Sequence, residues 1–230
     1  MSGFLSKSLN HDFQKGLYKV IIEALIECSN LMKEDCIANK TRIANHEEKI
    51  RNHLLENYLE NDDVRLRTGL SGIAVRFMPE APESYSSDTD TYSGRADIKV
   101  VSTNWLFGNN RDYYTVECKR IDGSGTLNEL YISEGICRFV IFPPKYSSFH
   151  NRNIMFGFVV KSVDIKSNAL DISKLHHDKL HSIINKDIDI LVNDGDKNFC
   201  LCESVYMIED RRLELGHIFY DFSAIICSNS

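Results

Sequence analysis

Asp97, Glu117 and Lys119 carry side chains that together could hydrolyse a phosphodiester bond. Glu117 and Lys119 are two positions apart, so a strand would place both on one face and turn Val116 and Cys118 to the other. Carboxylate oxygens are ligands that Mg²⁺ prefers, and a bound ion polarises a phosphate and generates hydroxide near neutral pH. The ammonium of Lys119 could position the attacking water, neutralise the transition state or, with its pKa lowered beside the metal, transfer a proton.

Two alternating segments should position these residues. In GRADIKVVS, alternation puts Ala96, Ile98 and Val100 on one face and Arg95, Asp97 and Lys99 on the other. A turn containing Gly108, Asn109 and Asn110 then leads into DYYTVECKRI, which favours a second strand. A hairpin between the two segments would bring Asp97 across from Glu117 and Lys119.

Helical spacing and breakers outline the rest of the chain. We expect a helix from about Asp12 to Met32, a second that starts at Asn39 to Thr41 and ends by Asn61, and extended and turn structure from Leu66 to Met78. PEAPESYSSDTDTYSG reads as a surface loop. Further along we expect a helix in TLNELYISEGICRFV with Thr126 as its cap, a buried strand in NIMFGFVVKSV, a helix in DISKLHHDKLHSIINK, and strands in FCLCESVYMIED and HIFYDFSAIIC. This order predicts an α/β fold.

The pattern of Asp97 followed across a hairpin by the Glu117-x-Lys119 triplet resembles the PD-(D/E)XK nuclease superfamily. The following helix and hydrophobic strand also look like that fold, so the resemblance covers roughly residues 41–161. Ala96 stands where the name-giving proline would be, which matters little because the carboxylate performs the chemistry. The resemblance implies a single domain over 1–230 with a restriction-endonuclease-like mixed sheet flanked by helices, two N-terminal helices and a C-terminal helix-strand extension.

The resemblance also implies a function. It predicts a Mg²⁺-dependent endonuclease acting on DNA, with Mn²⁺ able to substitute, in restriction or antiphage defence. Asp97 and Glu117 would bind the metal and Lys119 would assist the nucleophile. Glu47 is the candidate for a further metal ligand, because it interrupts the apolar stripe of Ile43, Ile50 and Leu54, where a carboxylate needs a cation or a donor.

Basic residues near the proposed site are candidate phosphate contacts: Arg95 and Arg120 first, then Lys99 and Arg138. The expected partners are duplex or single-stranded DNA, a helicase or ATPase, and a second copy of the chain. Two alternatives stay open. The chain could be a non-catalytic or partner-activated subunit of a nucleic-acid-processing complex, or a nuclease that cleaves RNA.

Other residues have competing interpretations. Glu117 and Lys119 could form a solvated ion pair on an exposed edge strand, and the loop residues Asp88 and Asp90 could replace Asp97 as ligands. His177 and His181, beside His176 on a predicted helix, could share a metal ion, although surface or core histidines are commoner. The Gly123 and Gly125 segment reads as a turn, not a phosphate loop. Tyr113 and Tyr114 could stack on bases but are more typical of strand packing.

Composition limits the remaining classes. The 230 residues carry a net charge of -6, which argues against coating duplex nucleic acid by charge alone. The seven cysteines lack the paired spacing of a zinc site, so we expect reduced thiols, with Cys200 and Cys202 on one face of a strand. No signal-like or membrane-spanning apolar run occurs, and we therefore expect a cytoplasmic protein without membrane contact.

Overall fold

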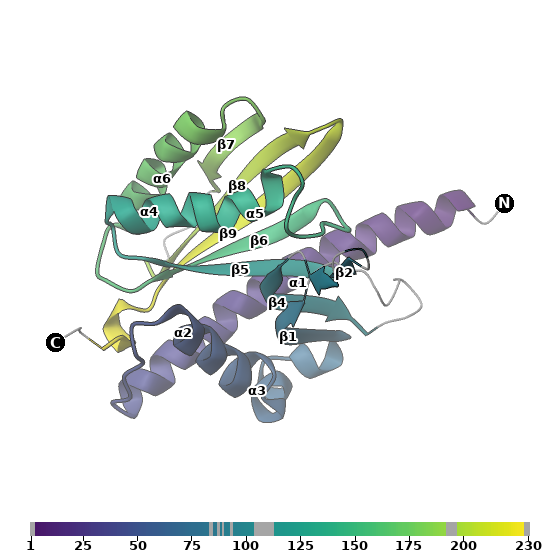
Figure 1. Cartoon of the computed structure of the whole chain (residues 1–230). Helices are drawn as coiled ribbons and strands as arrows, with labels where there is room; N and C mark the ends of the chain where they lie inside the picture. Colours follow the sequence, from purple (N-terminus) through teal and green to yellow (C-terminus); the bar gives the residue numbers. More distant parts are fainter. Residues whose placement is uncertain are drawn as a thin grey trace.

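A computed structural model describes residues 3–82, 85–86, 88, 90–92, 94–103, 113–191 and 197–227. Its centre is a seven-stranded mixed sheet with helices on both faces, which confirms the α/β class (Figure 1). Among the described residues, no helix is both long and apolar enough to cross a membrane. The turn expected around Gly108 falls outside the described residues.

The sheet has the strand order β1-β4-β5-β6-β9-β8-β7. Strands β5, β6 and β9 run parallel to one another, and all other neighbours are antiparallel. The strands span β1 (Val75–Pro82), β4 (Arg95–Ser102), β5 (Tyr113–Ile121), β6 (Arg152–Val159), β7 (Ile184–Ile190), β8 (Phe199–Ile208) and β9 (Arg211–Asp221). A separate short pair consists of β2 (Tyr85–Ser86) and β3 (Thr91–Tyr92).

Helices form a layer on each face of this sheet (Figure 1). One layer contains α1 (Gly3–Ala38), α2 (Glu47–Leu54), the π-helical turn η1 (Leu55–Leu59), α3 (Asp62–Arg67) and the 3-10 turn η2 (Leu70–Gly72). The other contains α4 (Gly125–Tyr131), the π-helical turn η3 (Ile132–Ile136), α5 (Cys137–Val140) and α6 (Ile165–Leu180), and the 3-10 turn η4 (Ser223–Ile225) follows β9. Two buried cores result, because each helical layer packs its apolar side chains on one face of the sheet.

Several predicted boundaries are wrong. The second helix begins only at Glu47, because Ile43 forms an isolated parallel bridge with Ile226. Ser124, not Thr126, caps α4: its Oγ accepts a hydrogen bond from the Leu127 amide (3.3 Å). Helix α1 extends beyond the expected bounds at both ends, and α6 begins before the expected segment.

The polar segment after residue 78 is not a loop throughout. Its first residues, 79–82, belong to β1, which pairs with β4, and the short hairpin of β2 and β3 follows. Backbone pairing with an interior strand therefore outweighs the local preference of this sequence for turns. Strand β7 was not predicted; it carries the sequence INKDIDI at one edge of the sheet, where few apolar residues are buried.

The expected hairpin between β4 and β5 is confirmed. Its ladder runs from Val101 opposite Tyr113 to Ile98 opposite Val116 and then ends. Beyond it, the amide of Cys118 donates to Asp97 Oδ2 (2.8 Å) in place of a backbone carbonyl. The predicted common face of β4 is also corrected here: Ala96 packs into the core below α4–α6, whereas Ile98 packs into the core below α1.

Candidate functional site

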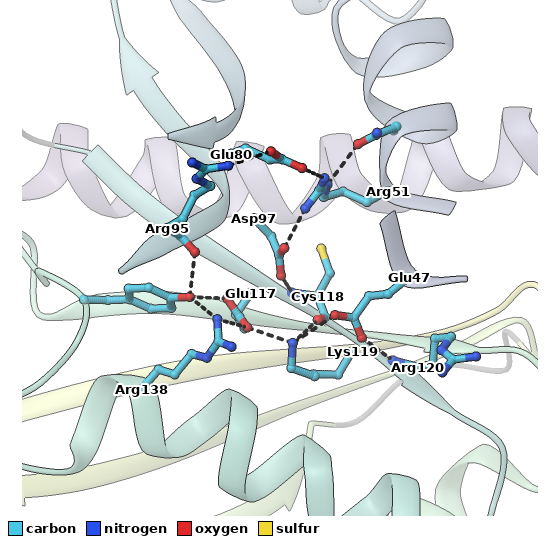
Figure 2. Close-up of polar contacts among 12 residues, drawn as sticks. Glu47, Arg51, Glu80, Arg95, Asp97, Glu117, Cys118, Lys119, Arg120 and Arg138 are labelled. Carbon is cyan, nitrogen blue, oxygen red and sulfur yellow. Dashed lines mark hydrogen bonds and ion pairs between the residues drawn. The ribbon is translucent and has the colours of Figure 1, made fainter. Parts of the chain in front are cut away.

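The structure brings Asp97, Glu117 and Lys119 together where the β4–β5 ladder ends (Figure 2). Helix α2 contributes Glu47 and Arg51 from one side, and α5 contributes Arg138 from the other (Figure 2). We call Glu47, Asp97, Glu117 and Lys119, together with Arg51 and Arg138, the acid-lysine cluster.

Glu117 lies at the centre of the cluster and its side chain is 0% exposed. Its Oε1 lies 2.8 Å from Lys119 Nζ and 3.0 Å from Arg138 Nη1, and its Oε2 accepts a hydrogen bond from Tyr146 Oη (2.8 Å). The interpretation as a solvated pair on an edge strand is therefore wrong, because β5 lies between β4 and β6 and this side chain has no contact with solvent.

The surroundings of Glu117 disfavour its charged form. Burial raises the pKa of Glu117 to about 7, and the nearby charge of Asp97 adds to the rise, while Lys119 and Arg138 oppose it. Although both cations lie within ion-pair distance, Oε1 accepts no well-aligned hydrogen bond from the described part of the chain. A carboxylate in this position would gain from an additional positive charge.

Lys119 bridges two acids. Its Nζ lies 2.8 Å from Glu117 Oε1 and 3.0 Å from Glu47 Oε1, and it donates to the carbonyl of Cys118 (2.9 Å). Burial disfavours the ammonium, but the two carboxylates outweigh it and hold the pKa of Lys119 above its ordinary value. In this arrangement Lys119 is a fixed cation. A lowered pKa, which proton transfer would require, is not what these surroundings produce.

Gly135 allows η3 to approach this lysine. A Cβ at that position would collide with the end of Met155 and lie 3.4 Å from Lys119 Cγ. The missing side chain lets the turn cover the lysine stem, which leaves only 10% of the Lys119 side chain exposed.

Asp97 is held by Arg51 as well as by the strand backbone. Its Oδ1 lies 2.7 Å from Nη1 of Arg51, whose side chain is only 4% exposed. The same guanidinium reaches Glu80 through Nη2 (2.6 Å), and Glu80 in turn contacts Arg95 (3.2 Å). The Asp97 carboxylate therefore has a fixed direction and a balanced charge.

Glu47 is positioned by the start of α2. Its Oε1 contacts Lys119, and its Oε2 accepts from the backbone amide of Arg120 (3.2 Å). The Arg120 guanidinium holds this end of the helix by donating to the carbonyl and to the side chain of Asn45 (2.9 and 3.0 Å). Glu47 thus contacts both a cation and a backbone donor, although Ile43 of the predicted stripe lies outside α2.

The chemistry of this cluster suits a hard divalent cation. Its acidic side chains offer oxygen ligands, and Mg²⁺ is commonly held by one or two carboxylates with the remaining positions filled by water. In the described residues no group of three or more His, Cys, Asp or Glu side chains is arranged to hold a metal ion. Asp97, Glu117 and Glu47 as metal ligands therefore stay predictions, and Lys119 lies between Glu47 and Glu117.

The predicted phosphate contacts differ in exposure. Arg95 is open to solvent, with 67% of its side chain exposed. Arg120 is partly buried against Asn45, and Lys99 is buried, with its ammonium donating to the carbonyl of Pro82 (2.5 Å) and lying 4.1 Å from the Tyr113 ring centre. Their roles in binding nucleic acid stay predictions, and the geometry favours Arg95.

The competing carboxylates and histidines have surroundings of their own. Asp88 and Asp90 are exposed turn residues. His177 contacts Asp187 through Nδ1 (2.9 Å) and not His181, while His176 is buried with its Nε2 2.7 Å from Tyr206 Oη.

The remaining candidates have structural surroundings. Cys200 and Cys202 share one face of β8 as expected, as free thiols with sulfurs 3.8 Å apart. Tyr114 is buried and donates to the carbonyl of Gln14 (2.8 Å). The segment around Gly123 is a turn that enters α4, as predicted.

Arg51 and Tyr146 were not identified from the sequence. Arg51 lies four residues after Glu47, so the spacing that places two side chains on one helical face could have indicated it. Tyr146 follows the Pro143-Pro144 segment, and its position beside Glu117 depends on how that segment folds back, since its amide donates to the Arg138 carbonyl (3.2 Å). Arg138 was expected only as a basic residue near the site, and it contacts Glu117 directly.

No family model, curated protein or solved structure matches this chain.

Proposed function

We propose that this protein is a divalent-cation-dependent nuclease that hydrolyses phosphodiester bonds at the acid-lysine cluster. The observation that carries the proposal is the convergence of Asp97, Glu117 and Lys119, contributed by two neighbouring strands. Buried carboxylates beside a fixed ammonium are expensive to maintain, which favours a functional reason for them.

Each residue has a role that follows from its contacts. Asp97 and Glu117 would hold the cation, which when bound polarises the phosphate and supplies hydroxide. Lys119 would stabilise the negative charge that develops on the phosphate, since its surroundings keep it charged. Arg138 and Tyr146 orient the Glu117 carboxylate through Oε1 and Oε2.

The topology around the cluster supports the PD-(D/E)XK relationship. Helix α2 precedes an antiparallel unit of β1, β4 and β5; the α4–α5 segment then leads to β6, which runs parallel to β5. This is the helix and strand that the resemblance places after the Glu-x-Lys triplet. Action on DNA, and a place in restriction or antiphage defence, rest on that resemblance alone.

A cleavage assay tests the proposal. Purified chain would be incubated with plasmid, single-stranded DNA and RNA, each with Mg²⁺ or Mn²⁺, alongside Lys119→Ala and the control Lys174→Ala. Lys174 is an exposed lysine on α6. We expect Lys119→Ala to lose cleavage by about 100-fold or more while it still binds Mn²⁺, and Lys174→Ala to keep it. Full activity in folded Lys119→Ala would reject the role proposed for Lys119. Which of the substrates is cleaved shows whether the target is DNA or RNA.

One observation favours a second candidate, a nuclease-fold subunit that works only in a complex. The cluster carboxylates already have protein cations: Asp97 has Arg51, and both Glu117 and Glu47 have Lys119. This candidate predicts that the isolated chain cuts none of the substrates and that Asp97→Asn leaves the activity of the assembled complex unchanged. Cleavage by the purified chain excludes it.

A further inference from the structure

A row of four charged residues follows the outer face of α1. Lys15, Lys19, Glu23 and Glu27 are spaced four residues apart, so they form one continuous ridge on the helix surface, and all are exposed. The opposite face of the helix, with Leu17, is buried against the sheet. The basic pair occupies the N-terminal half of the row and the acidic pair the C-terminal half.

This row borders an apolar groove of about 1110 Å³ between α1 and neighbouring elements. Its apolar lining includes Ile22 and Ile26 from α1 and Phe199 and Leu201 from β8, and all four charged residues also line it. An apolar floor with a charged rim is the usual anatomy of a protein-protein interface. The groove therefore has the composition of a surface that receives a protein partner.

The order of the charges is not explained by the helix itself. Within a helix, a glutamate that precedes a lysine by four residues is the more favourable arrangement, whereas here Lys19 precedes Glu23 and the other two neighbouring pairs have like charges. Lys19 Nζ lies 3.6 Å from Glu23 Oε1, but both side chains are largely exposed, so this pair contributes little. In the described part of the chain no ion pair involves Lys15 or Glu27.

The row is complementary to itself. If two copies of α1 cross antiparallel about a two-fold axis level with Ile21, Lys15 meets Glu27 of the second copy and Lys19 meets its Glu23, because both pairs are centred on residue 21. A two-fold interface requires this kind of self-complementary surface. A row with equal numbers of both signs does not suit a nucleic acid backbone, which attracts one sign only.

We propose that this face of α1 and its groove bind a second copy of the chain in a two-fold, antiparallel α1–α1 contact. Rows of residues at four-residue spacing are inclined to the helix axis. When the rows of the two copies align, the two α1 helices therefore cross at about 50°. Ile22 and Ile26 then approach the groove of the partner while the charges pair around it. This inference is independent of the proposed nuclease activity.

Charge reversal in the full chain tests the contact. Two variants are needed, Lys15→Glu/Lys19→Glu and Glu23→Lys/Glu27→Lys, each of which makes the row one sign. Alone, each variant should self-associate at least about tenfold more weakly than the wild-type chain, because like charges oppose one another at every pair. Mixed in equal amounts, the two variants should form a heterodimer, because every pair is again of opposite sign.

Sedimentation velocity over a concentration series measures these outcomes, with circular dichroism to verify folding. The control Lys166→Glu/Lys174→Glu makes the same change in net charge as Lys15→Glu/Lys19→Glu, but on the exposed face of α6, and should leave the dimer unchanged. A wild-type chain that stays monomeric at its highest soluble concentration overturns the proposal. So does a dimer that both reversals leave intact, or a mixture of the two variants that fails to associate.

Discussion

Two buried polar groups in this molecule differ in kind. The acid-lysine cluster contains charged groups. The second group joins Tyr131, His176, Ser204, Tyr206 and His217 by hydrogen bonds, and we call it the histidine-tyrosine network. In it, Ser204 Oγ donates to Tyr206 Oη (2.9 Å) and lies 2.8 Å from His217 Nε2, while Tyr131 Oη lies 2.9 Å from His217 Nδ1.

The two groups also differ in how burial acts on them. Burial lowers the pKa of His217 to about 3, with His176 adding to the effect, so the network is neutral near pH 7. In the cluster, opposite charges hold Lys119 in its charged form instead. A neutral, hydrogen-bonded network stabilises a core, whereas a cluster of charged groups offers electrostatic interactions to a ligand. We therefore expect the histidine-tyrosine network to contribute to stability and the acid-lysine cluster to carry the chemistry.

The largest expected effect is on chemistry. Glu117→Gln removes the central carboxylate charge, so we expect cation-dependent cleavage to fall by about 100-fold or more and Mn²⁺ binding to be lost, since a metal-bound transition state is worth several kcal/mol. Cleavage assays and calorimetric Mn²⁺ titration measure this, with exposed Glu56→Gln as the matched control. Unchanged Mn²⁺ affinity in Glu117→Gln would remove this residue from the metal site.

Acid should act on stability through the histidine-tyrosine network. Burial lowers the pKa of His176 to about 4, opposed by Asp187, and that of His217 to about 3, while an unfolded histidine titrates near ~6.5. Below about pH 6.5 the unfolded chain therefore binds more protons than the folded chain. The free energy of unfolding then falls as the pH falls from about 6.5 toward about 4, by up to ~1.4 kcal/mol per pH unit for each histidine.

Urea unfolding across this range measures the slope of the free energy of unfolding against pH. His217→Gln should flatten that slope by the contribution of one proton, and His46→Gln, at an exposed histidine, should not. A slope identical in His217→Gln and the wild-type chain contradicts a neutral, buried His217.

Removal of one hydroxyl should separate stability from chemistry. Tyr206→Phe takes away a partner of both His176 Nε2 (2.7 Å) and Ser204 Oγ (2.9 Å), so we expect a loss of about 1–3 kcal/mol in the free energy of unfolding. Cleavage and Mn²⁺ binding should not change. If Tyr206→Phe weakened Mn²⁺ binding, the division between the two groups would fail.

The smallest effect is the dependence of cation affinity on pH. Because the pKa of Glu117 is raised to about 7, a proton competes with the cation below that pH and little above it. The dissociation constant for Mn²⁺ should rise by about tenfold for each pH unit below ~7 and level off above it. Calorimetric titrations from about pH 5.5 to about pH 8.5 would show it, and a flat profile would mean that Glu117 does not bind the cation.

Much of the cluster was accessible from the sequence because strands have a period of two residues. That period placed Glu117 and Lys119 on one face, and the turn residues predicted the hairpin that brings Asp97 near them. Glu47 was predicted from a helical stripe that included Ile43; Ile43 lies outside α2, but Glu47 does contact Lys119. The two N-terminal helices, the long helix after Ser124 and the buried strand β6 were also predicted, although their ends were not.

What the sequence by itself determined is the set of reactive residue types, their spacing and the α/β order of the elements. Only the tertiary structure decided that β5 is an interior strand, that Arg51 and Arg138 balance the acids, and that Tyr146 reaches Glu117. It also decided that His176 of α6 belongs to a core network, while His177 is exposed and contacts Asp187. The physical reason is that periodicity is local, whereas burial and charge balance depend on which distant segments pack together.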